Sequence, residues 1–511
     1  MTYEGLSVEL RGYFYTYHEM LRLNNRIFRG FDHLASPFFS RRISSSKTCL
    51  NRDNGKWVCK LCDDEKLYIY GHKVGTKHTA AYLTINSRKP ITADVMRRAL
   101  KHLHRKFPPY HLRIRERDGE LWFFKPDGGD TELDFRVRET GTPKYQVIDE
   151  LYRPFDGVNG PMCRFEFIPA DGNDPCLFPD LKAKYPYQYY LADCPHHAVM
   201  DGFSNILFYS HLPNIVRTLL EGKELIDDSP VGEYISNEEY LRIYEKCAQG
   251  LLQNPEELTR VTSEVSRTDK RPLLFEAFPP PKTETPCTRH IMTQLDETYV
   301  SKISGKCKEM GITFGNVFQS ITTTALVELV QEAGVRKDIY DISVLSNANL
   351  RRYMKKRTNP ILGLHMRRMT AAYSVDGNVR DQFWSNCAKI QLLNQELLKN
   401  KSIIKQEVVR RLHFPYTPPE DFYKSKPELT IDFQYNNIGD LGDFGGNEQV
   451  VFTNAGNYFQ IHLSKIPFYH QLLSFKGNVI SILSYATDSV TDQTASALVE
   501  KMKCLFKHFS G

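Results

Sequence analysis

The sequence predicts a layered α/β protein built in two halves. The chain has 511 residues, which suffices for about two to four domains on a length basis. Short apolar and aromatic runs that are typical of strands are interspersed with helical spacings of apolar residues. Near the middle, residues 272–286 are rich in proline and predict an extended, semi-rigid connection. Strands and helices mixed in each half favour α+β or α/β layering.

The first half contains one well-defined helix and four strands. Thr92 is a good N-cap for the helix, because apolar residues from Val95 to Leu103 then fall on one face. A second helix is expected after residue 202, and Pro213 is expected to interrupt it. Residues 1–75 show little pattern and are interpreted as an N-terminal extension of unclear role. The strands are predicted at residues 80–85, 119–124, 164–168 and 187–192.

The second half begins with a helix that Thr313 caps. The last helix, around residues 495–506, has one apolar face and nearby lysines. Packing of that face into the core is the favoured interpretation, and weak contact with a membrane surface is the alternative. Strands are predicted at residues 340–345, 429–434, 458–463 and 478–485.

The composition is that of an ordinary globular protein, with 41% hydrophobic and 25% charged residues. No stretch approaches 18 consecutive apolar residues, so no transmembrane segment is expected. The N-terminus lacks the basic and apolar regions of a secretory signal. The eleven cysteines are scattered, which is typical of reduced thiols. We therefore expect a cytoplasmic protein, and a monomer.

Residues 196–202, His-His-Ala-Val-Met-Asp-Gly, are the most informative segment of the chain. They follow an apolar strand and precede a helical pattern, so a strand delivers two imidazoles to a tight turn. Histidine suits proton transfer near neutral pH because its unperturbed pKa is about 6.5. Gly202 permits the positive φ of a sharp turn. A histidine pair used only for packing is the alternative, and the strand-turn-helix context favours a site.

The segment resembles the HHxxxDG signature of the chloramphenicol-acetyltransferase-like acyltransferases. This superfamily includes nonribosomal-peptide condensation domains, alcohol acetyltransferases, plant BAHD acyltransferases and mycobacterial polyketide-associated acyltransferases. Residues 151–164 resemble the stretch upstream of the signature in condensation and alcohol-acetyltransferase sequences. Asn349-Leu350-Arg351 resembles a characteristic segment of the second half, and Asn437-Ile438-Gly439 resembles a late strand. The similar pieces follow the family's order over roughly residues 80 to 500.

The resemblance implies two similar lobes, each a mixed sheet with helices, and an active-site channel between them. The first lobe would comprise residues 76–270, the linker residues 271–288 and the second lobe residues 289–511.

The resemblance also implies the roles of the site residues. His197 would be the general base, and His196 would support it. Asp201 would be structural and pair with Arg351 from the second lobe, with Arg352 as the alternative partner, while Gly202 forms the turn. The substrate-binding residues implied in this way are Arg351 and Asn437. Neither a metal nor a covalent enzyme intermediate is expected.

The implied activity is acyl transfer from acetyl-CoA or another acyl-CoA, as co-substrate, to the hydroxyl of a small, apolar alcohol. An amine acceptor stays open, and no permanently bound cofactor is expected. Residues 1–120 carry 23 Lys and Arg against 12 Asp and Glu, a net charge of +11 compared with +6 for the whole chain. Such a segment could meet the phosphates of CoA or a membrane surface, although a solvated face is the simpler explanation. No nucleic-acid motif is present, so no nucleic-acid partner is expected.

Two functions of other classes remain open. One is an amide-forming condensation enzyme that takes thioesters from carrier proteins, but the chain has no carrier segment with a Gly-x-Asp-Ser site. The other is a non-catalytic binding module on the same fold, against which the intact His197 argues.

Three further patterns suggest other chemistry. Cys194 could pair with His196 as a nucleophile, but a buried cysteine is the favoured interpretation. Cys59 and Cys62, with His72 and His78, suggest zinc, yet the gap between the two pairs is shorter than in zinc fingers. Residues 443–445 read Asp-Phe-Gly, and a turn between two strands is favoured over the kinase motif or the BAHD motif.

Overall fold

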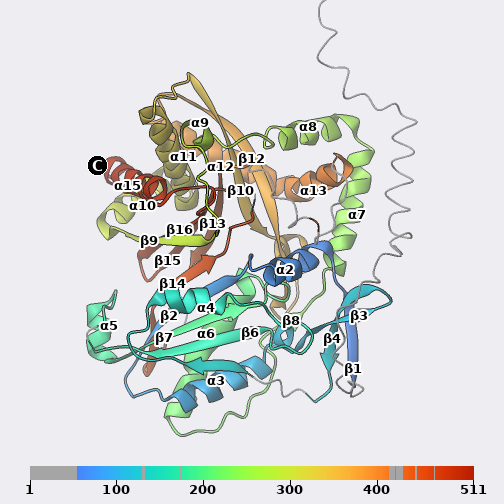
Figure 1. The fold of residues 1–511 in the computed structure, drawn as a ribbon, viewed down its shortest axis with the longest axis vertical. Helices are drawn as coiled ribbons and strands as arrows, with labels where there is room; N and C mark the ends of the chain where they lie inside the picture. The colour runs from blue at the N-terminus through green and yellow to red at the C-terminus, as the bar shows by residue number, and fades with distance from the viewer. Residues whose placement is uncertain are drawn as a thin grey trace, which may run out of the picture.

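Two β-sheets with helices packed on them form two lobes, which lie one above the other in Figure 1. The layered α/β architecture predicted from the sequence is confirmed. The computed structural model describes residues 54–128, 133–172, 174–413, 421, 430–442, 446–464 and 466–511.

The sheet of the first lobe has the strand order β14-β2-β7-β6-β5. Its strands are β2 (Thr79–Ser87), β5 (Asp134–Val137), β6 (Cys163–Pro169), β7 (Tyr187–Pro195) and β14 (Val450–Phe459). The helices of this lobe are α3 (Ala93–Arg105), η1 (Pro108–His111), α4 (Lys144–Leu151), α5 (Pro179–Lys184) and α6 (Gly202–Leu220).

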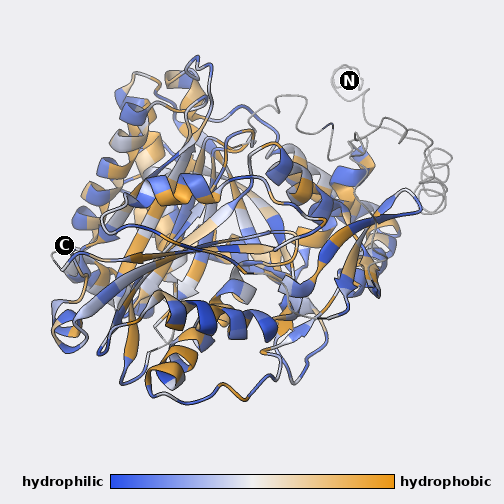
Figure 2. Cartoon of the chain, turned by 60° about the horizontal axis from the view of Figure 1, so that its bottom comes forward, coloured by the Kyte–Doolittle hydropathy of each residue, from blue (hydrophilic) through white to orange (hydrophobic). Residues whose placement is uncertain are grey.

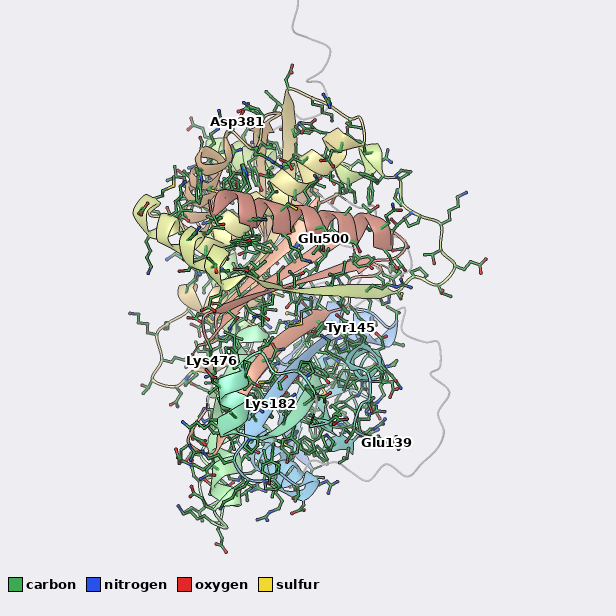
Figure 3. All side chains as sticks on the ribbon, turned by 90° about the vertical axis from the view of Figure 1, so that its left-hand side faces the viewer. Glu139, Tyr145, Lys182, Asp381, Lys476 and Glu500 are labelled. Carbon is green, nitrogen blue, oxygen red and sulfur yellow. The ribbon has the colours of Figure 1, made fainter. Side chains whose placement is uncertain are left out.

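Strand β14 comes from the second half of the sequence. It nevertheless pairs antiparallel with β2, from Val450 opposite Ser87 to Phe459 opposite Thr79. Figure 3 shows β14 beside β2 in the lower lobe. A segment of the second half therefore completes the first sheet, next to the strand that leads into residue 196.

Residues 55–126 add a small sheet and a helix beside the first lobe. The sheet has the order β1-β4-β3, and α2 lies at the junction of the two lobes in Figure 1. These elements are β1 (Gly55–Lys60), α2 (Asp63–Lys73), β3 (Arg113–Arg117) and β4 (Glu120–Pro126). The part of the predicted extension that follows residue 54 is thus ordered structure that packs against both lobes.

The sheet of the second lobe has the strand order β12-β10-β13-β15-β16-β9. Its strands are β9 (Thr288–Leu295), β10 (Ile339–Asn349), β12 (Met366–Asp376), β13 (Phe433–Asp440), β15 (Phe468–Phe475) and β16 (Asn478–Ala486). Its helices are α10 (Glu297–Met310), α11 (Phe314–Glu332), η2 (Leu350–Tyr353), α12 (Phe383–Lys399), α13 (Ser402–His413) and α15 (Asp492–Phe509).

Short elements connect the lobes. β8 pairs in parallel with β11, which ties a segment that follows the first lobe to the second half of the chain. The connecting elements are β8 (Glu233–Tyr234), α7 (Glu238–Leu252), α8 (Pro255–Ser266), α9 (Leu274–Ala277) and β11 (Ile361–Leu362).

Each lobe has its own hydrophobic core. Phe165, Leu191 and Phe208 are buried in the first, and Phe318 and Leu483 in the second. The outer helices show hydrophilic and hydrophobic turns side by side (Figure 2), which is the pattern of helices that bury one face.

The last helix, α15, buries Leu498, Met502 and Phe506 in the second core. Figure 3 shows α15, which carries Glu500, lying across the upper lobe. Its apolar face is therefore used for core packing rather than left open to a membrane. Among the described residues, no helix is long and apolar enough to cross a bilayer.

Most local predictions are confirmed. The four strands predicted in the first half coincide with β2, β4, β6 and β7. Thr92 caps α3 by accepting a hydrogen bond from the backbone N–H of Val95 at 3.2 Å. Thr313 likewise accepts from Asn316 N at the start of α11.

Three local predictions are wrong. Pro213 lies inside α6, which continues to Leu220 because Leu212, Val216 and Leu219 remain buried on one face. The strands predicted at 429–434 and 458–463 are shifted, since β13 starts at Phe433 and β14 ends at Phe459. The proline-rich connection is not extended throughout, because residues 274–277 form the short helix α9.

Candidate active site

His197 occupies the connection between β7 and α6 and lines a cavity that residues of both lobes enclose. Its side chain is buried, with 8% of the residue exposed. The imidazole stacks on Tyr68 of α2, with 4.1 Å between ring centroids and 15° between planes. Phe459 of β14 meets the same ring edge-on at 6.1 Å. Because protein encloses Nδ1 of His197, Nε2 is the nitrogen open to the cavity.

The environment of His197 keeps the imidazole neutral at pH 7. Burial lowers its pKa below the ordinary value of 6.5. The backbone carbonyls of His197 and Met200 and the carboxylate of Asp201 oppose this effect without cancelling it. A buried, neutral imidazole with one accessible nitrogen has the properties of a proton acceptor.

His196 points away from that cavity into a group of aromatic rings. Its Nδ1 accepts a hydrogen bond from the backbone N–H of Ala198 at 3.2 Å. Its ring lies 4.4 Å from that of His72 and 5.0 Å from that of Phe155, measured between centroids. Burial lowers the pKa of His196 to about 3, so this imidazole is also neutral. His196 therefore supports the loop and does not reach the cavity that His197 lines.

Asp201 binds Arg351 from the second lobe instead of orienting His197. The guanidinium donates from Nη1 to Oδ2 at 2.7 Å and from Nη2 to Oδ1 at 3.1 Å, which is a bidentate pair. Asp201 also accepts from His365 N at 2.9 Å and, as N-cap of α6, from Ser204 N at 3.1 Å. Burial would raise the pKa of Asp201, but Arg351 outweighs it and the pKa is lowered. The carboxylate is fully engaged in holding the two lobes together at this loop.

Gly202 does not have the conformation that the sequence predicts. It is the first residue of α6 and is absent from the residues with positive φ. A Cβ built at this position meets no atom within 4 Å. Gly202 lines the cavity, so the absence of a side chain leaves space there rather than permitting a left-handed turn.

The cavity next to His197 has a volume of about 650 Å³. We call it the amide chamber, because Asn and Gln are frequent among its lining residues. Asn437, predicted to bind substrate, lies in its wall, and its Oδ1 accepts from Gly439 N at 3.0 Å. Arg351 also lines it. The residues that define the chamber on the second lobe include Asn316, Gln319, Asn347, Gln391, Asn394 and Asn436.

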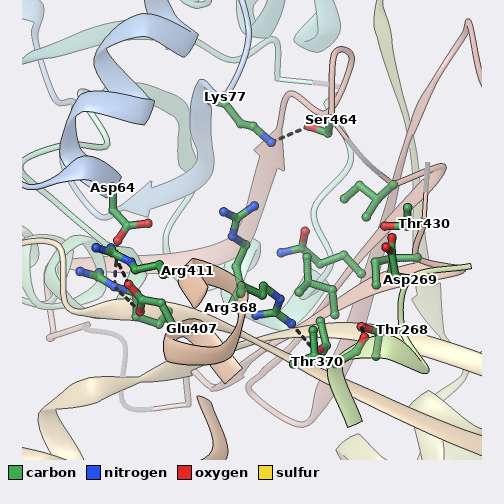
Figure 4. Close-up of a pocket in the computed structure, with 17 residues that line it drawn as sticks. Asp64, Lys77, Thr268, Asp269, Arg368, Thr370, Glu407, Arg411, Thr430 and Ser464 are labelled. Atoms are coloured by element: carbon green, nitrogen blue, oxygen red, sulfur yellow. Dashed lines mark hydrogen bonds and ion pairs between the residues drawn. The ribbon is translucent and has the colours of Figure 1, made fainter. Parts of the chain in front are cut away.

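A second cavity, of about 430 Å³, is lined by residues of β10, β12 and β13 and of the helices α8 and α13 (Figure 4). We call it the basic chamber, and its cationic lining residues are Lys77, Arg367, Arg368, Arg410 and Arg411. Its acidic lining residues are Asp64, Asp269 and Glu407.

Two of the five cations in the basic chamber are paired with carboxylates. Arg367 Nε lies 2.9 Å from Asp64, and Arg411 Nη2 lies 2.7 Å from Glu407. Arg410 instead donates to Thr370 Oγ1 at 2.6 Å, and the side chain of Arg368 makes no hydrogen bond or ion pair with a described residue. Figure 4 shows Lys77 and Arg368 pointing into the same space. The chamber thus keeps positive charge available for an anion.

The two chambers adjoin along β10 and β13. Leu345 and Gln434 line the basic chamber, whereas their chain neighbours Ser346 and Tyr435 line the amide chamber. The lining of the amide chamber continues through residues 346–349 of β10 and 435–438 of β13, so the two chambers are neighbours along these strands, and Gln434 Nε2 donates to Asn347 Oδ1 at 3.2 Å between them. Lys77 Nζ lies 5.8 Å from the ring centroid of Phe459, and that ring contacts His197. The imidazole therefore lies in the wall of the amide chamber, and the ring of Phe459 lies between it and Lys77 of the basic chamber.

The other candidate residues lie elsewhere. Cys194 is fully buried in the first core, and burial raises the pKa of its thiol to about 12, so it is not a thiolate nucleophile. Cys59 contacts the Tyr234 hydroxyl, while His72 stacks on His78 with 4.2 Å between centroids. Among the described residues no group of three or more His, Cys, Asp or Glu side chains is arranged to hold a metal. The Asp-Phe-Gly triplet at 443–445 lies outside the described residues.

No family sequence model matches the chain, and no curated protein matches it in sequence. Solved structures match it in fold. TRI3 trichothecene 15-O-acetyltransferase from Fusarium sporotrichioides aligns with a TM-score of 0.61 at 12% identity, over 90% of this chain and 97% of that protein. The first condensation domain of the calcium-dependent antibiotic synthetase aligns with a TM-score of 0.60 at 14% identity, over 89% and 97%. Polyketide synthase associated protein 5 from Mycobacterium tuberculosis aligns with a TM-score of 0.58 at 12% identity, over 89% and 100%.

The chain therefore has the two-lobed fold of the chloramphenicol-acetyltransferase-like condensation domains and acyltransferases. The resemblance drawn from residues 196–202 is confirmed at the level of the fold. At these identities the likeness does not extend to a substrate, so the chemistry has to be argued from the site.

Proposed function

We propose that the protein transfers an acyl group from an acyl-CoA thioester to an acceptor hydroxyl, with His197 as general base. The observation that carries the proposal is the position of His197, a neutral imidazole with Nε2 open, in the wall of the amide chamber and against Phe459, over whose ring Lys77 of the neighbouring basic chamber lies. Transfer between two substrates needs such a meeting point. A positioned general base contributes about 10²- to 10⁴-fold to a rate.

The chemical steps require only the imidazole and the two substrates. Nε2 of His197 accepts the proton of the acceptor hydroxyl while its oxygen attacks the thioester carbonyl carbon. The tetrahedral intermediate expels the thiolate, which takes the proton back from the imidazolium. An ester and a thiol are formed, and His197 returns to its neutral state. Because the pKa of His197 is lowered, the base is ready at pH 7.

The charge of the basic chamber supports an anionic donor such as acyl-CoA. Lys77, Arg368 and Arg410 have no carboxylate partner among the described residues that is in ion-pair contact. Burial, and then Arg368, lower the pKa of Lys77 to about 7, so a bound phosphate would favour its charged form. The phosphates of a nucleotide thioester would stabilise all three cations.

The experiment measures thiol release from acetyl-CoA and longer acyl-CoAs with a panel of alcohols and amines. We expect acceptor-dependent release in the wild type and a loss of about 10²- to 10⁴-fold in His197→Ala. His508→Ala, which removes an exposed histidine of α15, is the matched control. Release that persists in His197→Ala would contradict the role of the imidazole, and absence of release with every donor would contradict acyl transfer from CoA.

The donor assignment has its own test. Lys77→Ala and Arg368→Ala should each raise the KM for acetyl-CoA about tenfold. The KM of the wild type should depend more strongly on salt concentration than the KM of either variant. The KM for a truncated, uncharged thioester without the nucleotide should change little. Equal effects on both thioesters would show that the basic chamber does not hold the charged part of the donor.

A further inference from the structure

The amide chamber has an unusual lining. Eleven of its 32 lining residues are Asn or Gln, whereas the whole chain has 41 of these residues among 511. Carboxamides are thus about four times as frequent here as in the chain, which argues against a chance sampling of surface residues. Each carboxamide offers two N–H donors and a carbonyl acceptor. A chamber built in this way can hydrogen-bond many oxygen atoms of a ligand.

On the helical side of the chamber these carboxamides are fixed in place by one another. Asn394 of α12 donates to Asn316 Oδ1 at 2.8 Å and to Gln319 Oε1 at 3.1 Å, both on α11. Gln391 Oε1 accepts from the backbone N–H of Thr313 at 3.2 Å. This network determines which end of each amide faces the chamber. The Oδ1 atom of Asn394 is buried and has no protein partner among the described residues.

The sheet side of the chamber is organised in the same manner. Asn436 and Asn347 hydrogen-bond the Tyr469 hydroxyl. Burial raises the pKa of this hydroxyl, and the two hydrogen bonds offset only part of that increase. Asn347 Oδ1 also accepts from Gln434 Nε2 at 3.2 Å. Two walls of preset polar groups therefore face each other across the space beside His197. Preset donors and acceptors bind with less loss of conformational freedom than mobile ones.

The chamber offers little net charge to a ligand. Asp201 and Arg351 line it, but they neutralise each other in the bidentate pair. Arg352 is exposed and donates to Asn349 O, so it is the remaining cation in the lining. This contrasts with the neighbouring basic chamber, where Lys77, Arg368 and Arg410 have no carboxylate in ion-pair contact among the described residues. An anion would be held in that chamber and a neutral molecule in this one.

We infer that the acceptor is a neutral, polyoxygenated molecule, with several hydroxyl, ether or carbonyl oxygens besides the hydroxyl that is acylated. The inference rests on the proposed acyl transfer and differs from the small, apolar alcohol that the sequence suggested. An apolar acceptor would cover the carboxamides without replacing their hydrogen bonds to water, which is unfavourable. Phe203, Met369 and Leu398 supply apolar surface for the carbon skeleton of such a molecule. The volume of about 650 Å³ is that of a small-molecule site.

The test uses pairs of alcohols with the same carbon skeleton, from one six-membered ring to three fused rings. One member of each pair carries two or three additional hydroxyl or ether oxygens. With acetyl-CoA as donor, we expect kcat/KM to be at least about tenfold higher for the oxygenated member. Asn394→Leu and Asn316→Leu should reduce this preference about tenfold. Asn400→Leu, an exposed asparagine after the end of α12, is the matched control and should leave it unchanged.

The outcomes separate the inference from the proposed function. Equal or higher kcat/KM for the deoxygenated members would overturn the inference while leaving acyl transfer in place. A preference that survives both leucine variants would also overturn it, because the carboxamides would not be its source. No release with any member would overturn the proposed function instead. Calorimetric binding of the same pairs to the wild type would then decide the inference, and binding without preference would refute it.

Discussion

Breaking the pair between Asp201 and Arg351 should destabilise the protein more than it slows the chemistry. Two charge-assisted hydrogen bonds, at 2.7 and 3.1 Å, join side chains that are 3% and 10% exposed. Removing one partner of a buried pair costs about 3–5 kcal/mol, because the other charge stays buried without compensation. Asn is itself a good N-cap, so Asp201→Asn retains the bond from Ser204 N, while it removes the charge and the oxygen that accepts from His365 N and Arg351 Nη1. Asp201→Ala should cost about 1 kcal/mol more.

Denaturant unfolding followed by circular dichroism measures this loss. Arg351→Met should be destabilised about as much as Asp201→Asn, and the double variant should lose less than the sum of the two. Arg352→Met is the matched control, because Arg352 donates only to a backbone carbonyl, at 3.2 Å, and should change stability by less than about 0.5 kcal/mol. Since the pKa of Asp201 is lowered, the pair contributes above the unfolded pKa of about 3.8 and is lost as the pH falls below it. Wild-type stability of Asp201→Asn together with a 100-fold lower kcat would refute the reasoning and place the carboxylate in the chemistry.

Three other predictions follow from the surroundings of the site. Tyr68→Ala should raise the kinetic pKa of His197 towards 6.5, because it admits water to the stacked face of the imidazole. Tyr68→Phe keeps the stacked ring and should leave this pKa unchanged. A pH–rate profile that is the same in both variants would contradict this prediction. The free energy of unfolding should fall as the pH decreases from 6.5 towards 4, because His78 and His196 stay neutral in the folded state, with pKa values of about 4 and 3, while the unfolded chain binds protons. Each group should contribute up to about 1.4 kcal/mol per pH unit, measured by urea unfolding at pH 7.5 and 5.5, and a flat profile would count against it. Gly202→Ala should keep or slightly raise the melting temperature, because alanine favours a helix. The same substitution should lower kcat/KM for the bulkier acceptors. A loss of stability would show that the glycine backbone is required.

Sequence patterns predicted the first lobe well because local and tertiary preferences agree there. The strands β2 and β7 are apolar runs, and Thr92 begins a helix whose apolar residues fall on one face. The strand β14 was predicted at the wrong position because it contains Asn454, Gly456 and Asn457, which are poor strand formers. Its pairing with β2 overrides that local preference, and a pairing between residues more than 350 positions apart leaves no periodic signal.

The positions of the motif residues could be predicted where one residue type has one evident use, while the role of His197 as a base stays a prediction. His197 and the Asp201–Arg351 pair follow from a short motif and a single arginine in a similar segment. Tyr68 and Lys77 were missed, because they lie in or just after a stretch, residues 1–75, without a readable pattern. The carboxamides of the amide chamber were missed for another reason. Asn and Gln are ordinary surface residues in a sequence, and only folding collects eleven of them around one space.

The position of Lys77 shows how the segment after α2 contributes to the site. Its backbone has φ of 64°, a left-handed conformation that costs a residue with a side chain about 1–2 kcal/mol. That conformation turns the chain from α2, which carries Tyr68, into β2, which neighbours the strand before His197. The side chain of Lys77 then reaches over Phe459 into the basic chamber, while Tyr68 covers one face of the imidazole. One short segment therefore supplies both the ring that covers the His197 imidazole and a cation of the basic chamber. Because burying a phosphate among neutral amides would be unfavourable, we expect the proposed donor to bind in the basic chamber and the proposed acceptor in the amide chamber.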